Sequence, residues 1–262
     1  MLIKEYVEGK QTLKQLASRY GVCQKTIWNR LRAMRHIRVI SKYKDVVINM
    51  DTTYWGRNFG LMVIKDAFRN KILWYKFVSH ETVRDYSEGV KWLKDHGFKI
   101  YGIICDGLKG LFEEFRSYRV QMCQFHQSMI VRRYLTNNPE LPAAKELLRI
   151  SNMITHTDKE SFMGMIDQWY LKWSEFLKER TVDHKTNKST FTHKKLRSAY
   201  LSIKRNMYWL WTFYDYPELH IPNTNNALEG VFTDIKTKLR VHSGITKKRR
   251  ITLIQEYIAR HY

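Results

Sequence analysis

The chain has 262 residues, of which 44% are hydrophobic, and its low content of proline (4) and glycine (12) excludes disordered and fibrous proteins. Its 46 lysines and arginines against 25 aspartates and glutamates give a net charge of +21, so a polyanion such as nucleic acid is the expected partner. No apolar run reaches the roughly 18 residues of a membrane span, and the three scattered cysteines, Cys23, Cys105 and Cys123, favour a reducing cytoplasm.

Residues 1–44 are strongly basic and have the hydrophobic spacing of helices. Leu13 and Leu16 lie one turn apart, Gly21 interrupts the pattern, and Ile27 resumes it. This order predicts a helix-turn-helix DNA-binding segment, although an ordinary basic helical hairpin has the same pattern. On the first interpretation, the DNA-reading face of the second helix consists of Gln24, Lys25, Trp28, Asn29 and Arg32.

After residue 44 the hydrophobic period changes from that of helices to that of strands, with short runs rich in β-branched and aromatic residues. The predicted elements are strands at 46–51, 58–66 and 71–78, a helix from Val83 to a stop at Gly97, a strand at 100–106, a helix around 108–115 and a strand at 118–123. Three strands, helix, strand, helix, strand is the order of a ribonuclease-H-like core, an α/β fold in which helices flank a mixed sheet.

Residues 127–222 show no strand alternation and are rich in lysine, leucine, tryptophan and tyrosine, with a polar loop at 181–195. They predict an all-α insertion. A helix at 223–240 follows, whose N-terminus an Asn or Thr side chain can cap. The predicted organisation is a helix-turn-helix at 1–44, the first part of the core at 45–126, the insertion at 127–222, and the last part of the core with a C-terminal helix at 223–262.

Two aspartates follow predicted strands. Asp51 ends the first strand and Asp106 ends the fourth. A single aspartate at a strand end is most often a turn or cap residue. Two at matching ends of neighbouring strands, in a chain of net charge +21, instead predict a site for two Mg²⁺ or Mn²⁺ ions, because hard divalent cations prefer carboxylate oxygens.

A third acid is expected from a helix that passes beside these strands, and Glu229 is the candidate. On the 223–240 helix it belongs to a polar stripe with Lys236 and Arg240, next to an apolar stripe that would pack on the sheet. This placement predicts an acid aimed at the metal ions and two cations aimed at phosphate. The alternative is a solvated charged face.

Four segments together resemble the mutator-type DDE transposases of bacterial insertion sequences. They are DTTYWG at Asp51, CDGLKGL at Asp106, CQFH at 123–126 and TNNALEGVFTDIKTKLRVHSG around Glu229, and the resemblance covers about residues 45–245. It implies a metal-binding catalytic triad of Asp51, Asp106 and Glu229, a supporting pair of Cys123 and His126, and a position for His242 beside the active site.

The resemblance also implies a function. A transposase of this family binds the ends of a mobile element, cuts the DNA by metal-dependent hydrolysis and joins the freed 3′-hydroxyl to target DNA. The expected partners are double-stranded DNA and further copies of the chain on that DNA, with no membrane, in the nucleoid of a bacterial cytoplasm. A structure-selective nuclease on the same fold and a catalytically inactive helix-turn-helix regulator are the alternatives.

The roles of Cys123 and His126 stay open at this stage. A zinc site would need two further ligands, and no nearby CxxC or HxxH supplies them. The pair would otherwise close the corner beside Asp106, with His126 bonded to a phosphate or a carboxylate, or it is a buried structural pair. The aromatic residues of the insertion are expected in its core, with one alternatively stacked on an unpaired base.

Overall fold

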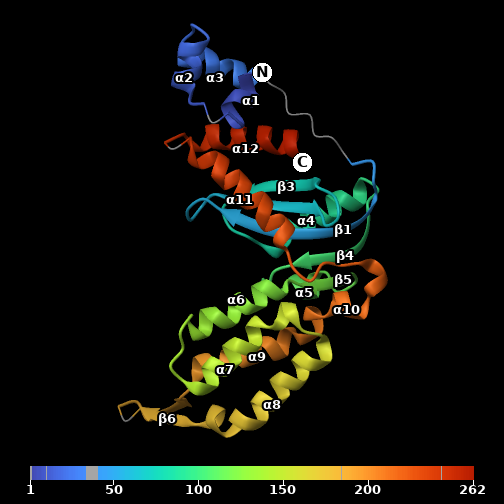
Figure 1. Cartoon of the computed structure of the whole chain (residues 1–262), viewed down its shortest axis with the longest axis vertical. Helices are drawn as coiled ribbons and strands as arrows, with labels where there is room; N and C mark the ends of the chain where they lie inside the picture. Colours follow the sequence, from blue (N-terminus) through green and yellow to red (C-terminus); the bar gives the residue numbers. More distant parts are fainter. Residues whose placement is uncertain (1, 10, 34–40, 184, 243) are drawn as a thin grey trace.

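The computed structural model describes residues 2–9, 11–33, 41–183, 185–242 and 244–262. The molecule is elongated (Figure 1): the N-terminal helices lie at one end, a β-sheet lies in the middle, and a group of helices with a small β-hairpin forms the other end. No described helix is both long and apolar enough to span a bilayer.

The central sheet has five strands in the order β3-β2-β1-β4-β5. The first three strands pair antiparallel, and β1 pairs with β4, and β4 with β5, in parallel. This mixed α/β arrangement is compatible with the predicted ribonuclease-H-like fold. The strands are β1 (Asp45–Tyr54), β2 (Gly60–Asp66), β3 (Ile72–Val78), β4 (Lys99–Cys105) and β5 (Arg119–Met122).

Strand β1 is longer than the predicted 46–51, so the expectation that Asp51 ends it is wrong. Its antiparallel pairing with β2 continues to Tyr54 opposite Gly60, and this hairpin keeps the chain extended. The parallel pairing with β4 stops earlier, at Asn49 opposite Ile104. Asp51 therefore lies beyond the last residue of β1 that pairs with β4, although it lies within β1. We call this part of the strand, on its β4 side, the open end of β1.

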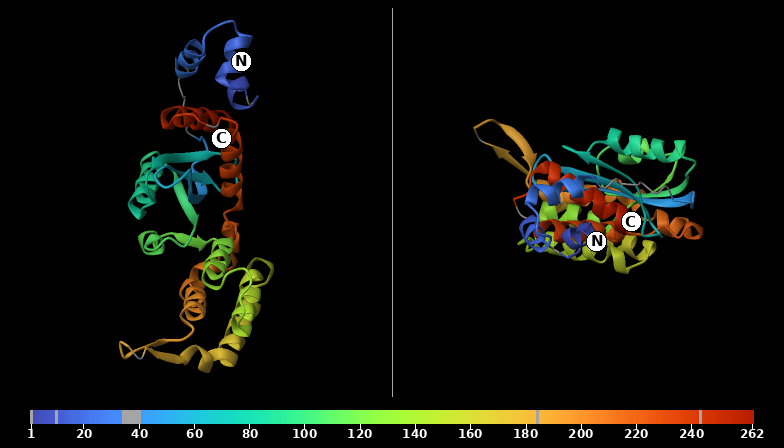
Figure 2. Two further views of the ribbon diagram at one scale, coloured as in Figure 1. Left: turned by 90° about the vertical axis from the view of Figure 1, so that its left-hand side faces the viewer. Right: turned by 90° about the horizontal axis from the view of Figure 1, so that it is seen from above.

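Helices cover both faces of the sheet (Figure 2). On one face α4 (Val83–Asp95) packs against β-strand residues such as Ile48 and Met62, and Thr82 caps this helix by accepting a hydrogen bond from the Asp85 N–H at 3.1 Å. On the other face α11 (Asn226–Arg240) and α12 (Lys247–His261) bury the alternate residues of β2. Asp51 alternates with Met50 and faces the α11 side.

The N-terminal segment forms α1 (Leu2–Val7), α2 (Leu13–Arg19) and α3 (Gln24–Ala33), with a left-handed Gly21 (φ 61°) between the last two. A capping box at Thr12 and Gln15 starts α2. Their buried residues belong to the same apolar cluster as α11, α12 and one face of the sheet. The three helices therefore pack on the core.

Beyond β5 the chain is mainly helical and is tied to the sheet edge by buried hydrogen bonds. Gln121 Nε2 donates to the Leu210 carbonyl at 3.0 Å, and Thr212 Oγ1 donates to the Val120 carbonyl at 2.6 Å. The helices around and after β5 are α5 (Leu111–Glu114), α6 (Gln124–Leu135), α7 (Pro142–Asn152), α8 (Lys159–Lys178), α9 (Lys194–Leu210) and α10 (Thr212–Asp215), with 3₁₀ turns at Ile154–His156 and Pro217–Leu219.

Two features of this part differ from the sequence prediction. The expected polar loop at 181–195 contains the antiparallel strands β6 (Arg180–Asp183) and β7 (Lys188–Phe191), so the segment 127–222 is not all-α. The paired residues are Arg180 with Phe191, Thr181 with Thr190, Val182 with Ser189 and Asp183 with Lys188. These strands are too polar to resemble core strands. The expected boundary after residue 126 falls inside α6.

Candidate metal centre

The open end of β1 brings three carboxylates together. Asp106 follows β4 directly, and the parallel register of Asn49 with Ile104, continued by two residues, sets Asp51 opposite Asp106. Glu81 comes from the turn between β3 and α4. Ligand oxygens of Asp51, Glu81 and Asp106 all lie within 4.8 Å of one another. The two predicted aspartates therefore meet, and the glutamate that joins them is one the sequence analysis missed.

Backbone and side-chain donors hold these carboxylates in place. The Thr52 N–H donates to Asp51 Oδ1 at 2.7 Å, and the Leu108 N–H donates to Asp106 Oδ1 at 3.0 Å. The Tyr86 hydroxyl donates to Glu81 Oε1 and also lies 3.0 Å from Thr52 Oγ1. These bonds engage Oδ1 of each aspartate and Oε1 of Glu81.

The cluster lacks a compensating positive charge. Burial is the largest cause that raises the pKa of Asp51 well above its usual value, and the negative charge of Asp106 raises it further. Burial and Asp106 likewise raise the pKa of Glu81. Within the described ranges, none of these three carboxylates forms an ion pair with a lysine or arginine. Such a site must either bind protons or bind a cation.

Glu229 lies beside this cluster without belonging to the closest three. It occupies the first turn of α11, its Oε1 is 3.8 Å from His126 Nε2, and its charge is the weakest of the effects that raise the pKa of Asp51. Of the predicted triad, the structure therefore brings Asp51 and Asp106 together, and the third acid within 4.8 Å of them is Glu81, whereas Glu229 lies outside that group.

The residue before α11 also faces the acids. Asn225 is fully buried, and its Nδ2 lies 3.3 Å from the Met50 carbonyl and 3.4 Å from Asp51 Oδ2. Its Oδ1 has no partner among the described atoms. The expectation that an Asn or Thr side chain caps this helix is wrong, because the Asn225 side chain turns to Asp51 and makes no capping bond.

Cys123 and His126 close the corner between β5 and α6. The Cys123 N–H donates to the Cys105 carbonyl at 2.9 Å, and its Sγ accepts from the Asn225 N–H at 3.2 Å. Burial raises the pKa of the Cys123 thiol to about 11, so it is protonated at neutral pH. In the described chain, the pair belongs to no cluster of three or more metal-binding side chains. The geometry favours the corner-closing interpretation over the zinc site.

The predicted supporting residues of α11 lie farther along that helix. Lys236 and Arg240 line a pocket together with Tyr54. His242 is buried beyond the end of α11, with its ring 4.4 Å from the ring of Tyr6. The thirteen residues from Glu229 to His242 correspond to about 20 Å of helical rise, so the structure does not bring His242 to the acids.

The predicted DNA-reading side chains differ in accessibility. Gln24, Lys25, Asn29 and Arg32 are exposed on α3. Trp28 is half-buried, and the guanidinium of Arg249 lies 5.0 Å from the centre of its ring. Trp28 therefore packs on α12 instead of lying free on the outer face.

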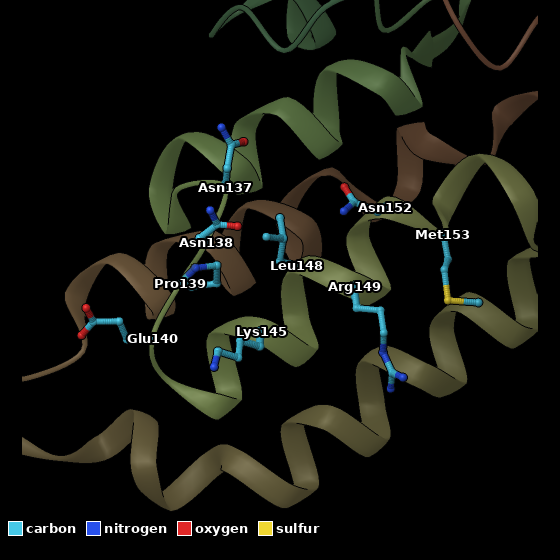
Figure 3. A pocket seen from close by; sticks show the side chains of 9 residues that line it. All are labelled: Asn137, Asn138, Pro139, Glu140, Lys145, Leu148, Arg149, Asn152 and Met153. Carbon is cyan, nitrogen blue, oxygen red and sulfur yellow. The ribbon is translucent and has the colours of Figure 1, made fainter.

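The aromatic residues of the helical part are mainly core. Trp169 and Trp211 are buried, and Trp209 stacks on Phe112 with ring centroids 4.5 Å apart. Tyr208 is 73% exposed. The hollow of about 760 Å³ in this part is lined by the α6–α7 connection and α7 (Figure 3), away from the acids, and it offers one carboxylate, Glu140.

Comparisons with known proteins add little to this geometry. No protein-family model matches the chain, and no curated protein matches it. Among solved structures, one similar chain belongs to the cryo-EM structure of the simian T-cell lymphotropic virus intasome in complex with PP2A regulatory subunit B56 gamma. The similarity covers 60% of this chain and 69% of that chain, with 14% sequence identity and a TM-score of 0.25, which is too low to assign a function.

Proposed function

We propose that this chain is a metal-dependent DNA transposase, which binds the ends of a mobile element, hydrolyses a phosphodiester there and joins the freed strand to target DNA. The observation that carries the proposal is the group of three carboxylates within 4.8 Å at the open end of β1, in a chain of net charge +21. A protein that only binds DNA gains nothing from acids that repel phosphate.

The donor set fits Mg²⁺ or Mn²⁺. Asp51, Asp106 and Glu81 offer only carboxylate oxygens, which hard divalent cations prefer. Glu229, whose charge also raises the pKa of Asp51, would add a fourth carboxylate from α11. Bound there, two such ions would activate water or a 3′-hydroxyl and stabilise charge on the reacting phosphate.

Residues of the chain itself supply orientation and charge. The Thr52 N–H orients Asp51, and His126, 3.8 Å from Glu229, supports that carboxylate or donates to a phosphate oxygen. On α11, Lys236 and Arg240 follow Glu229 on the same face and neutralise the bound strand. The exposed side chains of α3 would read base edges as the recognition helix of a helix-turn-helix.

A structure-selective nuclease is the competing function. The closeness of Glu81 to both aspartates favours it, because these three acids suffice for hydrolysis without Glu229. The motif order around Asp51, Asp106 and Glu229 favours the transposase. A catalytically inactive regulator is disfavoured, since it would have no use for the acid cluster.

The test is a cleavage and strand-transfer assay on duplexes that carry the DNA flanking the gene, with Mg²⁺ or Mn²⁺. We expect Asp51→Asn and Asp106→Asn to lose at least about 100-fold in both reactions while duplex binding persists, because they remove charge at the reacting centre. The matched control is Asp167→Asn, an exposed acid paired with Lys204 at 3.7 Å, which should retain full activity. Cleavage without joining would favour the nuclease, and wild-type turnover in either aspartate variant would refute both.

Recognition of the DNA at the ends of the element is tested with a separate set of variants. Deletion of residues 1–44 would expose the apolar cluster that α1 to α3 share with α11 and α12, so surface changes are preferable. Lys25→Gln combined with Asn29→Ala should reduce the preference for the flanking DNA over unrelated duplex and leave the melting temperature unchanged. An undiminished preference would move recognition to another part of the chain.

A further inference from the structure

A second polar site lies on the α11 side of the sheet, separate from the acid cluster. It is a pocket of about 560 Å³ between the end of β1, the C-terminal half of α11 and the start of α12. Its polar and aromatic lining consists of Tyr54, Trp55, Lys236, Arg240, His242 and Arg250.

The pocket is positively charged. Lys236, Arg240 and Arg250 line it, and its lining contains no aspartate or glutamate. None of the three cations forms an ion pair within the described part of the chain. Lys247 and Arg250 both lie over the ring of Phe59, at 5.3 and 5.8 Å from its centroid. The described lining of the pocket therefore has positive charge that no acid in that lining neutralises.

Two buried nitrogens at the pocket lack hydrogen-bond partners. They are Trp55 Nε1 and His242 Nε2, both without a partner among the described atoms. His242 is only 5% exposed and is held by the ring of Tyr6, whose centroid is 4.4 Å away. Trp55 packs against Phe59 with centroids 5.4 Å apart. Unpaired buried polar atoms are costly, so a ligand with oxygen atoms would satisfy groups that the protein leaves unpaired.

The pocket and the acid cluster are connected by two rigid elements. Trp55 follows Asp51 by four residues, directly after the end of β1, which is about 13 Å of strand rise and returns to the same face of the sheet. Lys236 follows Glu229 by seven residues on α11, which is about 10 Å and returns to the same helix face. A DNA strand that reaches the acids can therefore reach the pocket, since about 10 Å is roughly three nucleotides of B-form rise.

We propose that this pocket binds a backbone phosphate of the DNA strand, two to four nucleotides from the phosphate that reacts at the acid cluster. Lys236, Arg240 and Arg250 neutralise that phosphate, and the Trp55 indole N–H donates to one of its oxygens. The proposal rests on the proposed function, because it takes the bound strand to be DNA held at the metal centre.

The first experiment measures duplex binding by fluorescence anisotropy over a range of salt concentrations, without divalent metal so that no cleavage occurs. We expect Lys236→Gln and Arg250→Gln each to lower the slope of log K against log salt by about 0.9 and to weaken binding roughly eightfold at 0.1 M salt. The matched control is Lys91→Gln, which removes one exposed charge from α4 on the opposite face of the sheet. Equal slopes for the control and the pocket variants would overturn the proposal.

The second experiment locates the contact on the DNA. Single neutral methylphosphonates are placed at successive positions of the strand, and each duplex is bound to the wild type and to Arg250→Gln. We expect one position to weaken the wild type roughly eightfold and to have no further effect on Arg250→Gln. An identical response of both proteins at every position overturns the assignment to DNA.

Free inorganic phosphate is the other ligand that could bind the same groups of the pocket. Wild type and Trp55→Phe are compared by tryptophan fluorescence during titration with inorganic phosphate at millimolar concentration. A Trp55-dependent response without any methylphosphonate effect would also overturn the DNA assignment. The transposase function and phosphate binding in the pocket can be refuted independently. A wild type that binds DNA through the pocket but never cleaves it refutes the transposase function. An enzyme that cleaves DNA but whose pocket variants bind it normally refutes phosphate binding in the pocket.

Discussion

Replacement of Asp51 by asparagine is expected to stabilise the metal-free protein while it abolishes catalysis. Asp51 is 8% exposed and lies with Glu81 and Asp106 in a group whose ligand oxygens are within 4.8 Å of one another. At an effective dielectric constant of about 20, two unit charges at that distance repel by roughly 3.5 kcal/mol. Folding therefore concentrates negative charge that the unfolded chain keeps apart.

The direction of the pKa shift determines how the stability of the wild type changes with pH. Burial and Asp106 raise the pKa of Asp51 above its value in the unfolded chain, so the folded state holds the proton more tightly. This stabilisation is complete below the unfolded pKa and is lost as pH rises through the folded pKa. The wild type should accordingly lose stability relative to Asp51→Asn as pH rises from about 4.

The asparagine fits the site chemically. Its carbonyl can still accept from the Thr52 N–H, which donates to Asp51 Oδ1 at 2.7 Å, and its amide can donate to the unpaired Oδ1 of Asn225 after that side chain rotates. Because Glu81 and Asp106 are half-buried and solvent screens their charges, we expect a net gain of about 2 kcal/mol, less than the sum of two pair repulsions.

The assay is thermal unfolding by circular dichroism in EDTA at pH 7 and at pH 4, repeated with Mg²⁺. About 2 kcal/mol corresponds to a rise of roughly 4–8 °C for a chain of this size. Mg²⁺ at 100 times its dissociation constant should stabilise the wild type by about 2.7 kcal/mol and the variant by much less. Asp167→Asn is the control, with a change within about 0.5 kcal/mol. A variant that melts below the wild type at pH 7, or equal stabilisation of both by Mg²⁺, would refute the reasoning.

Three further predictions test the surroundings of the site. His126→Ala should slow single-turnover cleavage by about 10- to 150-fold, the equivalent of one charge-assisted hydrogen bond of 1.5–3 kcal/mol, with the melting temperature unchanged; a rate within twofold of wild type would remove it from the machinery. A thiol reagent should label Cys23 rapidly, since it is exposed and Thr26 lowers its pKa, and should reach Cys105 and Cys123 only after unfolding; fast labelling of three thiols would contradict the packing. Gly89→Ala should cost about 1–3 kcal/mol in urea unfolding, because the added Cβ would lie 2.5 Å from a β2 side chain; a cost below 0.5 kcal/mol, as is typical of a surface change, would show that α4 can move.

Much of the sheet could be predicted because its signals are local. The runs at 46–51 and 100–106 contain the β-branched residues that form β1 and β4, and Gly97 has the positive φ of 80° that its stop position implied. The meeting of Asp51 with Asp106 followed from one further assumption, that these strands are neighbours, and their parallel register confirms it.

The features that the sequence did not reveal depend on tertiary contacts. His242 belongs to a recognisable motif segment, yet its ring packs against that of Tyr6 in α1, a contact between the two ends of the chain that no local spacing encodes. The β6–β7 hairpin escaped notice because its strands are short and exposed, without the apolar alternation that burial imposes on a core strand.

Glu81 shows why a third ligand is harder to predict than the first two. It directly precedes Thr82, the N-cap of α4, where an acid is ordinarily explained by helix capping. Only the turn from β3 into α4 and the hydroxyls of Tyr86 and Thr52 bring it to the aspartates. Glu229 approaches from α11 on the other face of the sheet. Each helical layer thus carries a glutamate toward the aspartate pair. Local spacing does not rank the two, because both are acids at a helix start, and only the resemblance of the segment around Glu229 favoured that residue. The contacts of the folded chain separate them: Thr52 turns toward α4, where the Tyr86 hydroxyl meets both Thr52 and Glu81, whereas Glu229 lies beside His126.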